Sequence, residues 1–249
     1  MSAQLAYVLR LADTSLVLGQ RLAEWVGHAP ALEEDLGLAN ISLDLIGQAR
    51  LLLTYAGELE GRGRSEDDFA YLREQDEFLN FALVEQPNGD FGHTIVRQML
   101  LGAFQLELYE ALQNSQDRKL AEIAAKALKE TRYHFRYSAS WVVRLGDGTE
   151  ESRTRVQTAL DSLWRFTHEL FAADEIDEAM AQAKVAPPLS ELAPRWLARV
   201  EGVLKEATLE HPADVPYKWH GKRGQHTEHL GYLLAEMQSL HRAHPGVTW

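Results

Sequence analysis

Apolar residues recur at three- and four-residue steps along most of the 249 residues, and alternating strand-like runs are scarce. This spacing places apolar side chains on one face of an α-helix. We therefore predict an all-α fold with long helices over residues 5–26, 32–59, 91–114 and 118–145. Glycine or proline at residues 27–30, 61–63 and 146–148 ends the first, second and fourth of these helices, and residues 87–89 form a turn before the third.

The layout of these four helices predicts how they assemble. They form two pairs, joined by a connector of about 30 residues with a shorter helical stretch over residues 67–85, as in a ferritin-like four-helix bundle with one long crossover. Additional C-terminal helices over residues 151–172, 174–183, 190–208 and 227–243 would pack outside the bundle. Because length and composition require no division, we predict a single domain over residues 1–249.

Composition excludes several classes of function. The 37 Asp and Glu against 25 Lys and Arg give a net charge of -12, which opposes binding to a phosphate backbone, so no nucleic-acid partner is expected. Cysteine is absent, which excludes disulfides, thiolate catalysis and cysteine-ligated metal centres. No signal-like segment begins the chain, and its most apolar stretch, residues 41–56, is interrupted by polar residues. We expect a cytoplasmic protein that does not span a membrane.

A narrow polar stripe crosses the second predicted helix, which is otherwise apolar nearly all round. Asn40, Asp44 and Gln48 lie on one edge of this helix, with Gly37 and Gly47 beside them. One interpretation is a solvent-exposed face. The short amides, carboxylate and glycines favour a second interpretation, in which the stripe lines the bundle interior or a close helix contact.

The fourth predicted helix carries a carboxylate and an imidazole one turn apart. Glu130 and His134 lie along or beside its inward stripe and could share a proton, form a structural pair or chelate a metal. The stripe itself consists of small, apolar and hydroxyl residues: Leu120, Ala124, Ala127, Thr131, Ser138 and Leu145.

The spacing that a di-iron bundle needs is missing from both helices. Such a centre takes a Glu-x-x-His step from each of two helices. Here the steps read Asp44-x-x-Gly47 and Glu130-x-x-Tyr133, and His134 is displaced by about 100° around its helix. These five residues are degenerate ligand positions, and we predict no metal and no catalytic residue in this chain. The first and third helices offer other polar residues that fix no facing carboxylate: Asp13, Gln20, Glu24, Gln98, Gln105 and Glu107.

Groups of residues along almost the whole chain form a set that is far more specific than any one motif. They are Leu18 and residues 20–22, 24–25, 27–30, 38–41, 43–50, 84–89, 129–130, 132–134, 163–167, 169–171, 174–177, 226–231 and 234–238. In these groups the chain resembles the structural C-subunit family of the bacterial ring-1,2-phenylacetyl-CoA epoxidase.

The resemblance implies a ferritin-like subunit that stabilises a homologous catalytic subunit but is not itself catalytic. The partner would hold the di-iron centre and receive electrons from a reductase. The complex would convert phenylacetyl-CoA and O2 into a ring epoxide in phenylacetate catabolism, with the substrate at the partner's site. Asp44 and Glu130 would then be remnants of a ligand set, held by hydrogen bonds or ion pairs.

Two other hypotheses remain open. The first is a catalytically competent metal–carboxylate oxygenase built from Asp44, Glu130 and His134. The second is an independent helical bundle that binds phenylacetyl-CoA by itself. Retained stoichiometric metal would favour the first, and tight binding of the ligand by the isolated chain would favour the second.

The segment before the last predicted helix gathers cations and imidazoles. It could be a capped helix start with interface hydrogen bonds, or a mononuclear zinc site formed by its histidines. Its cations could also attract an acidic partner surface or CoA phosphates. The residues concerned are Lys218, Lys222, Arg223, His226, Glu228 and His229.

Large aromatic residues lie within the helical periods of the second half of the chain. They fit either the core or a subunit interface, since aromatic side chains anchor both. These residues are Trp141, Trp164, Phe166, Phe171 and Trp196.

Overall fold

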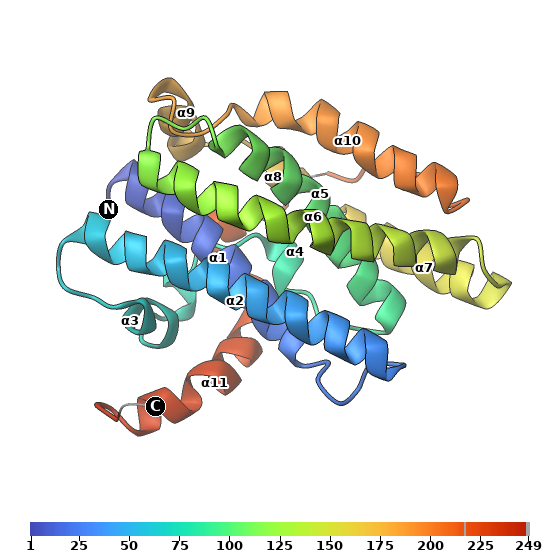
Figure 1. Ribbon diagram of the computed structural model, residues 1–249, viewed down its shortest axis with the longest axis horizontal. Coiled ribbons are helices and arrows are strands. Elements are labelled where there is room, and N and C mark those ends of the chain that lie inside the picture. The colour runs from blue at the N-terminus through green and yellow to red at the C-terminus, as the bar shows by residue number, and fades with distance from the viewer. Residues whose placement is uncertain (217, 248–249) are drawn as a thin grey trace. The chain divides into compact units, whose positions relative to one another are not determined.

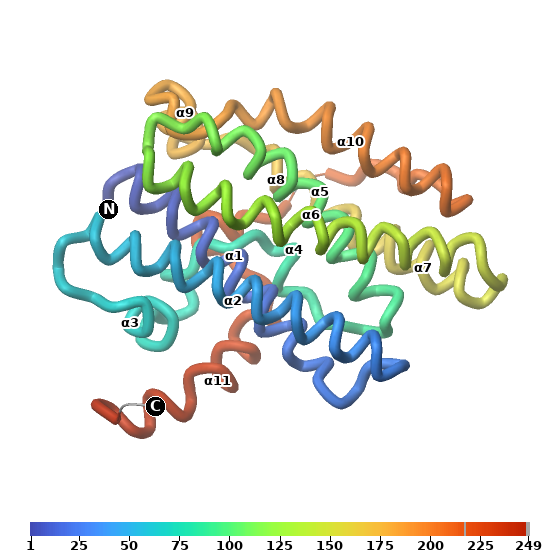
Figure 2. The backbone as a smooth tube through the Cα atoms, viewed as in Figure 1, coloured from blue at the N-terminus to red at the C-terminus, as the bar shows by residue number. Residues whose placement is uncertain are grey.

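The structure, a computed structural model, describes residues 1–216 and 218–247 and confirms the all-α prediction. Over these residues the backbone forms helices and connecting turns, without a β-strand. Its β-type pairing is one isolated bridge between His220 and Gln225. The described residues, whose course along the chain Figures 1 and 2 trace, divide into two compact units. One contains residues 1–87 and 219–247, and the other contains residues 88–216 and 218. The single-domain organisation stays a prediction.

The first unit is built on two long antiparallel helices, α1 and α2 (Figure 1). Their contact is close because Gly19 has no side chain, and a Cβ there would lie 3.1 Å from Cγ1 of Ile46. Beside it the Ser42 hydroxyl donates a hydrogen bond of 2.8 Å to the Gly19 carbonyl. Helix α11 packs on α1, α3, α4 and η1. The elements of this unit are α1 (Ala3–Ala23), α2 (Leu32–Glu60), α3 (Glu66–Tyr71), η1 (Gln75–Glu77), α4 (Ala82–Glu85), η2 (Gly221–Arg223) and α11 (Glu228–Ala243).

The prediction of one helical stretch over residues 67–85 is wrong. The chain instead forms the short helices α3, η1 and α4, because tertiary bonds replace helical ones between them. The Arg73 guanidinium donates to the carbonyls of Phe69 and Glu77, at 2.6 and 3.0 Å, and also binds the buried carboxylate of Asp13. An arginine fixed in this way holds the bend between α3 and η1.

The second unit is built on the antiparallel helices α5 and α6, against which α7 and α10 pack. The Asp90 side chain caps α5 by accepting a 2.8 Å hydrogen bond from the His93 backbone. The helix predicted over residues 151–172 is divided by a turn at residues 165–167. The elements of this unit are α5 (Phe91–Leu112), α6 (Arg118–Gly146), α7 (Glu150–Trp164), α8 (His168–Phe171), α9 (Glu175–Gln182) and α10 (Leu189–Glu206).

Aromatic side chains fill the core between α5, α8 and α10. Trp164, Phe166 and Trp196 are buried, which confirms the core interpretation for these three, whereas Phe171 and Trp141 are half-buried. The Trp196 ring centre lies 5.5 Å from that of Trp164, with the two rings tilted by 33°, and Nε1 of Trp196 donates a 2.9 Å hydrogen bond to the carbonyl of Leu100. The polar edge of this indole is therefore satisfied inside the core.

Helix α2 is long and apolar enough to pass a length-and-composition test for a membrane span. Half of its most apolar window is buried in the structure. A core helix of a soluble protein passes the same test, so this helix is weak evidence for a membrane.

Candidate functional site

The contact between α5 and α6 defines the polar interior of the second unit. The two helices approach where Gly102 lies against Phe135, with a Cβ at Gly102 placed 3.4 Å from the Phe135 Cα. Because the helices are antiparallel, this contact places Gln98 roughly level with Ser138, and Gln105 roughly level with Thr131. All four of these polar side chains are buried. At this contact the interior is lined by amides and hydroxyls, whereas a di-iron bundle needs carboxylates and imidazoles.

The Glu130-x-x-Tyr133 step of α6 does not face this interior. Tyr133 is 39% exposed and Glu130 is half-buried, whereas Thr131 and His134 are fully buried. A residue at the Tyr133 position would therefore aim its side chain away from the core. Except for Leu145, which is half-buried, the predicted inward stripe of α6 is buried as expected.

Glu107, the carboxylate that the third predicted helix offered, is held in an ion-pair cluster. Its Oε1 accepts a 2.9 Å hydrogen bond from Nε of Arg199, and its Oε2 lies 3.2 Å from Nε of Arg195. Both arginines come from α10, and the Arg199 guanidinium also lies 5.6 Å from the centre of the Phe135 ring. The cluster joins α10 to the α5–α6 pair and commits both oxygens of Glu107 to arginine.

Asp13 of α1 is the corresponding buried carboxylate in the first unit. Its two oxygens are bound by the Arg73 guanidinium, and Oδ2 also accepts a 2.9 Å hydrogen bond from the Leu79 backbone. The same guanidinium lies 4.2 Å from the centre of the Phe78 ring. Asp13 is therefore a structural anion whose charge is neutralised by one arginine.

The polar stripe of α2 runs from the surface into the interior. Asn40 is exposed, Asp44 is half-buried, and Gln48 is buried, so each interpretation of the stripe holds for part of it. A Cβ at Gly47 would meet no atom within 4 Å. Gly47 is therefore not required by packing within this chain.

The sequence did not single out Glu85, the most elaborately bonded carboxylate of the first unit. Its Oε1 lies 2.5 Å from Nδ1 of His226 and accepts a 3.0 Å hydrogen bond from Asn80. Its Oε2 accepts hydrogen bonds of 2.8 and 2.6 Å from the backbone and hydroxyl of Thr227. Nε2 of His226 lies 2.8 Å from the carbonyl of Phe78. The only signal in the sequence is a carboxylate that directly follows the apolar run of residues 81–84.

Arg21 of α1 also contributes hydrogen bonds to this cluster. The Arg21 guanidinium donates hydrogen bonds of 3.1 and 2.9 Å to the Glu85 carbonyl and one of 3.0 Å to the His229 carbonyl. The segment that precedes α11 is thereby fixed to both α4 and α1. This geometry agrees with the interpretation of that segment as a structural helix start.

The other predicted residues of this segment are dispersed. Lys222 is buried and its carbonyl accepts a 3.1 Å hydrogen bond from Arg10, whereas Lys218, Arg223 and Glu228 are exposed. Their contact with a partner or with CoA phosphates stays a prediction.

The donor set does not fit a di-iron centre. Over the described ranges, 1–216 and 218–247, no group of three or more His, Asp or Glu side chains has a geometry that could hold a metal. Asp44 lies on α2 of the first unit, and Glu130 and His134 lie on α6 of the second. Each long-helix pair instead commits its buried carboxylate, Asp13 or Glu107, to arginine.

Long antiparallel helix pairs, a broken crossover and extra C-terminal helices define a ferritin-like helical bundle without the ligand pattern of a metal centre. The family model described as "Phenylacetic acid catabolic protein" matches residues 1–249. The chain is 52% identical over 249 residues, 100% of both chains, to the Escherichia coli (strain K12) protein named as the C subunit of 1,2-phenylacetyl-CoA epoxidase. The chain belongs to the phenylacetic acid catabolic protein family, which confirms the resemblance seen in the sequence.

Proposed function

We propose that this chain is the non-catalytic structural subunit of a cytoplasmic multicomponent phenylacetyl-CoA epoxidase, where it binds and stabilises a homologous di-iron subunit. Identity of 52% over the full length of a relative that is named as the C subunit of such an enzyme supports the role in the complex. One observation supports the non-catalytic role. Where the di-iron pattern has an inward histidine, α6 carries Tyr133, which is 39% exposed.

The proposal assigns the chemistry to other chains. The catalytic partner would hold the di-iron centre and phenylacetyl-CoA, and a reductase would supply its electrons. This chain would contribute a rigid helical support, with Asp13, Glu85 and Glu107 bonded internally. Buried carboxylates of this kind maintain a shape because each has its partners.

Reconstitution tests this proposal. The chain is purified alone, and then with the catalytic subunit and reductase of the same epoxidase, and conversion of phenylacetyl-CoA is measured for each mixture. We expect no turnover by the chain alone, and turnover by the mixture that falls when this chain is omitted. Turnover by the isolated chain would favour the oxygenase built on Asp44, Glu130 and His134. Tight binding of phenylacetyl-CoA by the isolated chain would favour a ligand-binding bundle.

A further inference from the structure

Helix α6 has the opposite charge to the rest of this protein. Its residues, Arg118–Gly146, include 7 Lys and Arg but only 2 Glu, whereas the whole chain carries -12. Without α6, 18 cations face 35 carboxylates, a net charge of -17. A helix of charge +5 on such an acidic protein creates a local positive field.

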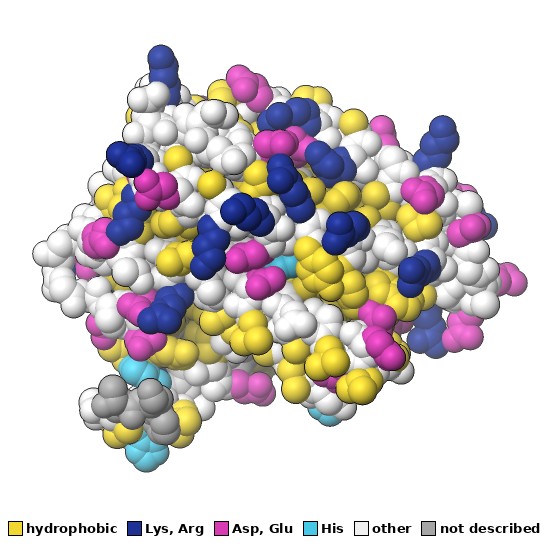
Figure 3. Space-filling view, viewed as in Figure 1, with side chains coloured by type: hydrophobic (Ala, Val, Ile, Leu, Met, Phe, Trp, Pro, Cys, Tyr) yellow, Lys and Arg dark blue, Asp and Glu magenta, His cyan; other side chains and the backbone are white. Residues whose placement is uncertain are grey.

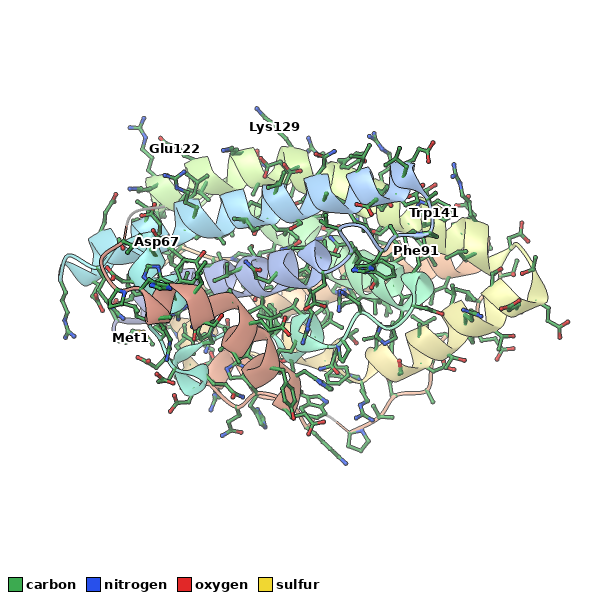
Figure 4. All side chains as sticks on the ribbon, turned by 90° about the horizontal axis from the view of Figure 1, so that it is seen from below. Met1, Asp67, Phe91, Glu122, Lys129 and Trp141 are labelled. Carbon is green, nitrogen blue, oxygen red and sulfur yellow. The ribbon has the colours of Figure 1, made fainter. Side chains whose placement is uncertain are left out.

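The charges of α6 lie on its outer surface. Lys126, Lys129, Arg136 and Arg144 are all exposed, and Figure 3 shows Lys and Arg side chains gathered along this helix with apolar side chains beside them. Figure 4 shows Lys129 extending away from α6 into solvent. At 1.5 Å per residue, the stripe from Lys126 to Arg144 is about 27 Å long. That length is enough for one side of a standard protein interface of about 800 Å².

These four cations have no carboxylate partner among the described residues. Other side chains of α6 do form ion pairs, such as Arg118 with Glu122 at 3.1 Å and Arg132 with Glu110 at 3.8 Å. Cations on an acidic protein are commonly neutralised by neighbouring carboxylates. On α6 they remain available for charges from another molecule.

Aromatic side chains are interleaved with the cations. Tyr133 and Tyr137, one turn apart, have ring centres 6.1 Å apart, and the Arg136 guanidinium lies 5.8 Å from the Tyr133 ring. One turn further on, the Arg144 guanidinium lies 5.4 Å from the Trp141 ring. Tyr, Trp and Arg are the residues that dominate the energetics of protein interfaces. We call this surface, from Lys126 to Arg144, the α6 face.

We infer that the α6 face docks an acidic surface of the di-iron subunit of the epoxidase complex, an inference that rests on the proposed function. Charge complementarity points to carboxylates as the partner groups. A long polyanion such as nucleic acid would extend beyond α6 and meet the -17 of the remaining chain. A protein partner can confine its negative charges to the footprint of one helix, and its aliphatic and aromatic groups would cover the tyrosines.

A charge-reversal experiment on the full chain tests this inference. The variant Lys129→Glu/Arg136→Glu/Arg144→Glu is compared with the unaltered chain for binding to the purified di-iron subunit by titration calorimetry. We expect Kd to rise at least about 10-fold, because like charges then face each other across the interface. For the unaltered chain, we expect Kd to rise with salt, and this dependence should weaken in the variant.

A matched control separates local charge from net charge. The variant Arg62→Glu/Arg153→Glu/Lys205→Glu changes the net charge by the same amount at exposed positions outside α6. We expect its Kd to stay within about 2-fold of the unaltered chain, since charges far from an interface are screened. Equal binding by the α6 variant and the unaltered chain would overturn the inference alone. Absence of binding by the unaltered chain would overturn the proposed function as well.

A second variant tests the aromatic part of the α6 face without changing its charge. Tyr133→Ala/Tyr137→Ala should weaken binding at least about 10-fold if these rings are anchors. Circular dichroism and the Tm of each free variant establish that the chain is folded.

Sedimentation of the isolated chain tests whether a second copy of this chain binds the α6 face instead. If the isolated chain is a dimer that dissociates on charge reversal at α6, the face belongs to a contact between two copies and the inference is wrong.

Discussion

Glu85 and His226 form a fully buried pair, with Oε1 of Glu85 2.5 Å from Nδ1 of His226. The second ring nitrogen of His226 faces the carbonyl of Phe78, which can only accept a hydrogen bond. Nε2 therefore donates to the Phe78 carbonyl, while Nδ1 lies within hydrogen-bond distance of Oε1 of Glu85. The bond joins residues 141 positions apart and fixes the start of α11 to the end of α4.

Removal of the imidazole should destabilise the chain strongly. We expect His226→Leu to lower the free energy of unfolding by about 3 kcal/mol, because the buried Glu85 carboxylate then loses its imidazole partner. Urea denaturation measures this loss. The exposed His28 provides the control, and His28→Ala should change stability by less than about 0.5 kcal/mol. A loss at His226 no larger than at His28 would show that the pair does not hold the segment.

The buried pair of Arg73 and Asp13 predicts a non-additive result. Arg73→Leu should destabilise by about 3–5 kcal/mol, since it leaves the Asp13 carboxylate buried without its cation. The double variant Asp13→Leu/Arg73→Leu should be less destabilised than the single one, as measured by urea unfolding. Arg118→Leu removes an exposed pair and should cost less than about 1 kcal/mol. Simple additivity of the two buried substitutions would contradict this account.

Two glycines should respond to alanine in opposite directions. A Cβ at Gly146, at the end of α6, would lie 2.4 Å from the Ala207 carbonyl oxygen, whereas one at Gly202 in α10 meets nothing within 4 Å. We expect Gly146→Ala to lower the free energy of unfolding by about 1–3 kcal/mol. Gly202→Ala should raise it by about 0.5–1 kcal/mol, because alanine favours a helix. Thermal unfolding of the two variants gives both signs, and a change of the same sign in both would refute the predicted contact.

His93 makes stability depend on pH. Burial lowers the pKa of His93 below its usual 6.5, with Arg97 acting in the same direction and Asp90 and the Asn88 backbone opposing it. The unfolded chain therefore binds a proton more readily than the folded one, so His93 costs stability as the pH falls through about 6.5. Histidine titrates between about pH 7.5 and 5.5. As the pH falls over this range, we expect the Tm of the unaltered chain to fall relative to the Tm of His93→Gln. A difference that stays constant over this range would exclude the effect.

The long helices could be predicted because local sequence specifies them. Residues 32–59 were expected and α2 spans Leu32–Glu60, since a left-handed glycine, Gly61, ends the periodic pattern. The crossover could not be predicted, because Arg73 bends it through a carboxylate on α1. Its separate helices depend on contacts distant in sequence, which propensity does not report.

The candidate site, like the fold, could be predicted only in part. The missing histidines at Gly47 and Tyr133 could be read from the three-residue step. The outward direction of Tyr133 could not, because a helical wheel gives the angles between residues but not the face that meets the core. Glu85 was missed because its partner His226 lies in a segment whose fold the sequence pattern does not fix.

Metal analysis of separated subunits tests the central claim most directly. The chain is co-expressed with its catalytic partner in iron-supplemented cells, the complex is purified, and the subunits are separated without chelator before iron is measured in each. We expect the iron to remain with the partner, because α6 presents Tyr133 outward and both buried carboxylates of the long helices bind arginine. Stoichiometric iron retained by this chain, with the spectrum of a coupled pair, would contradict the account.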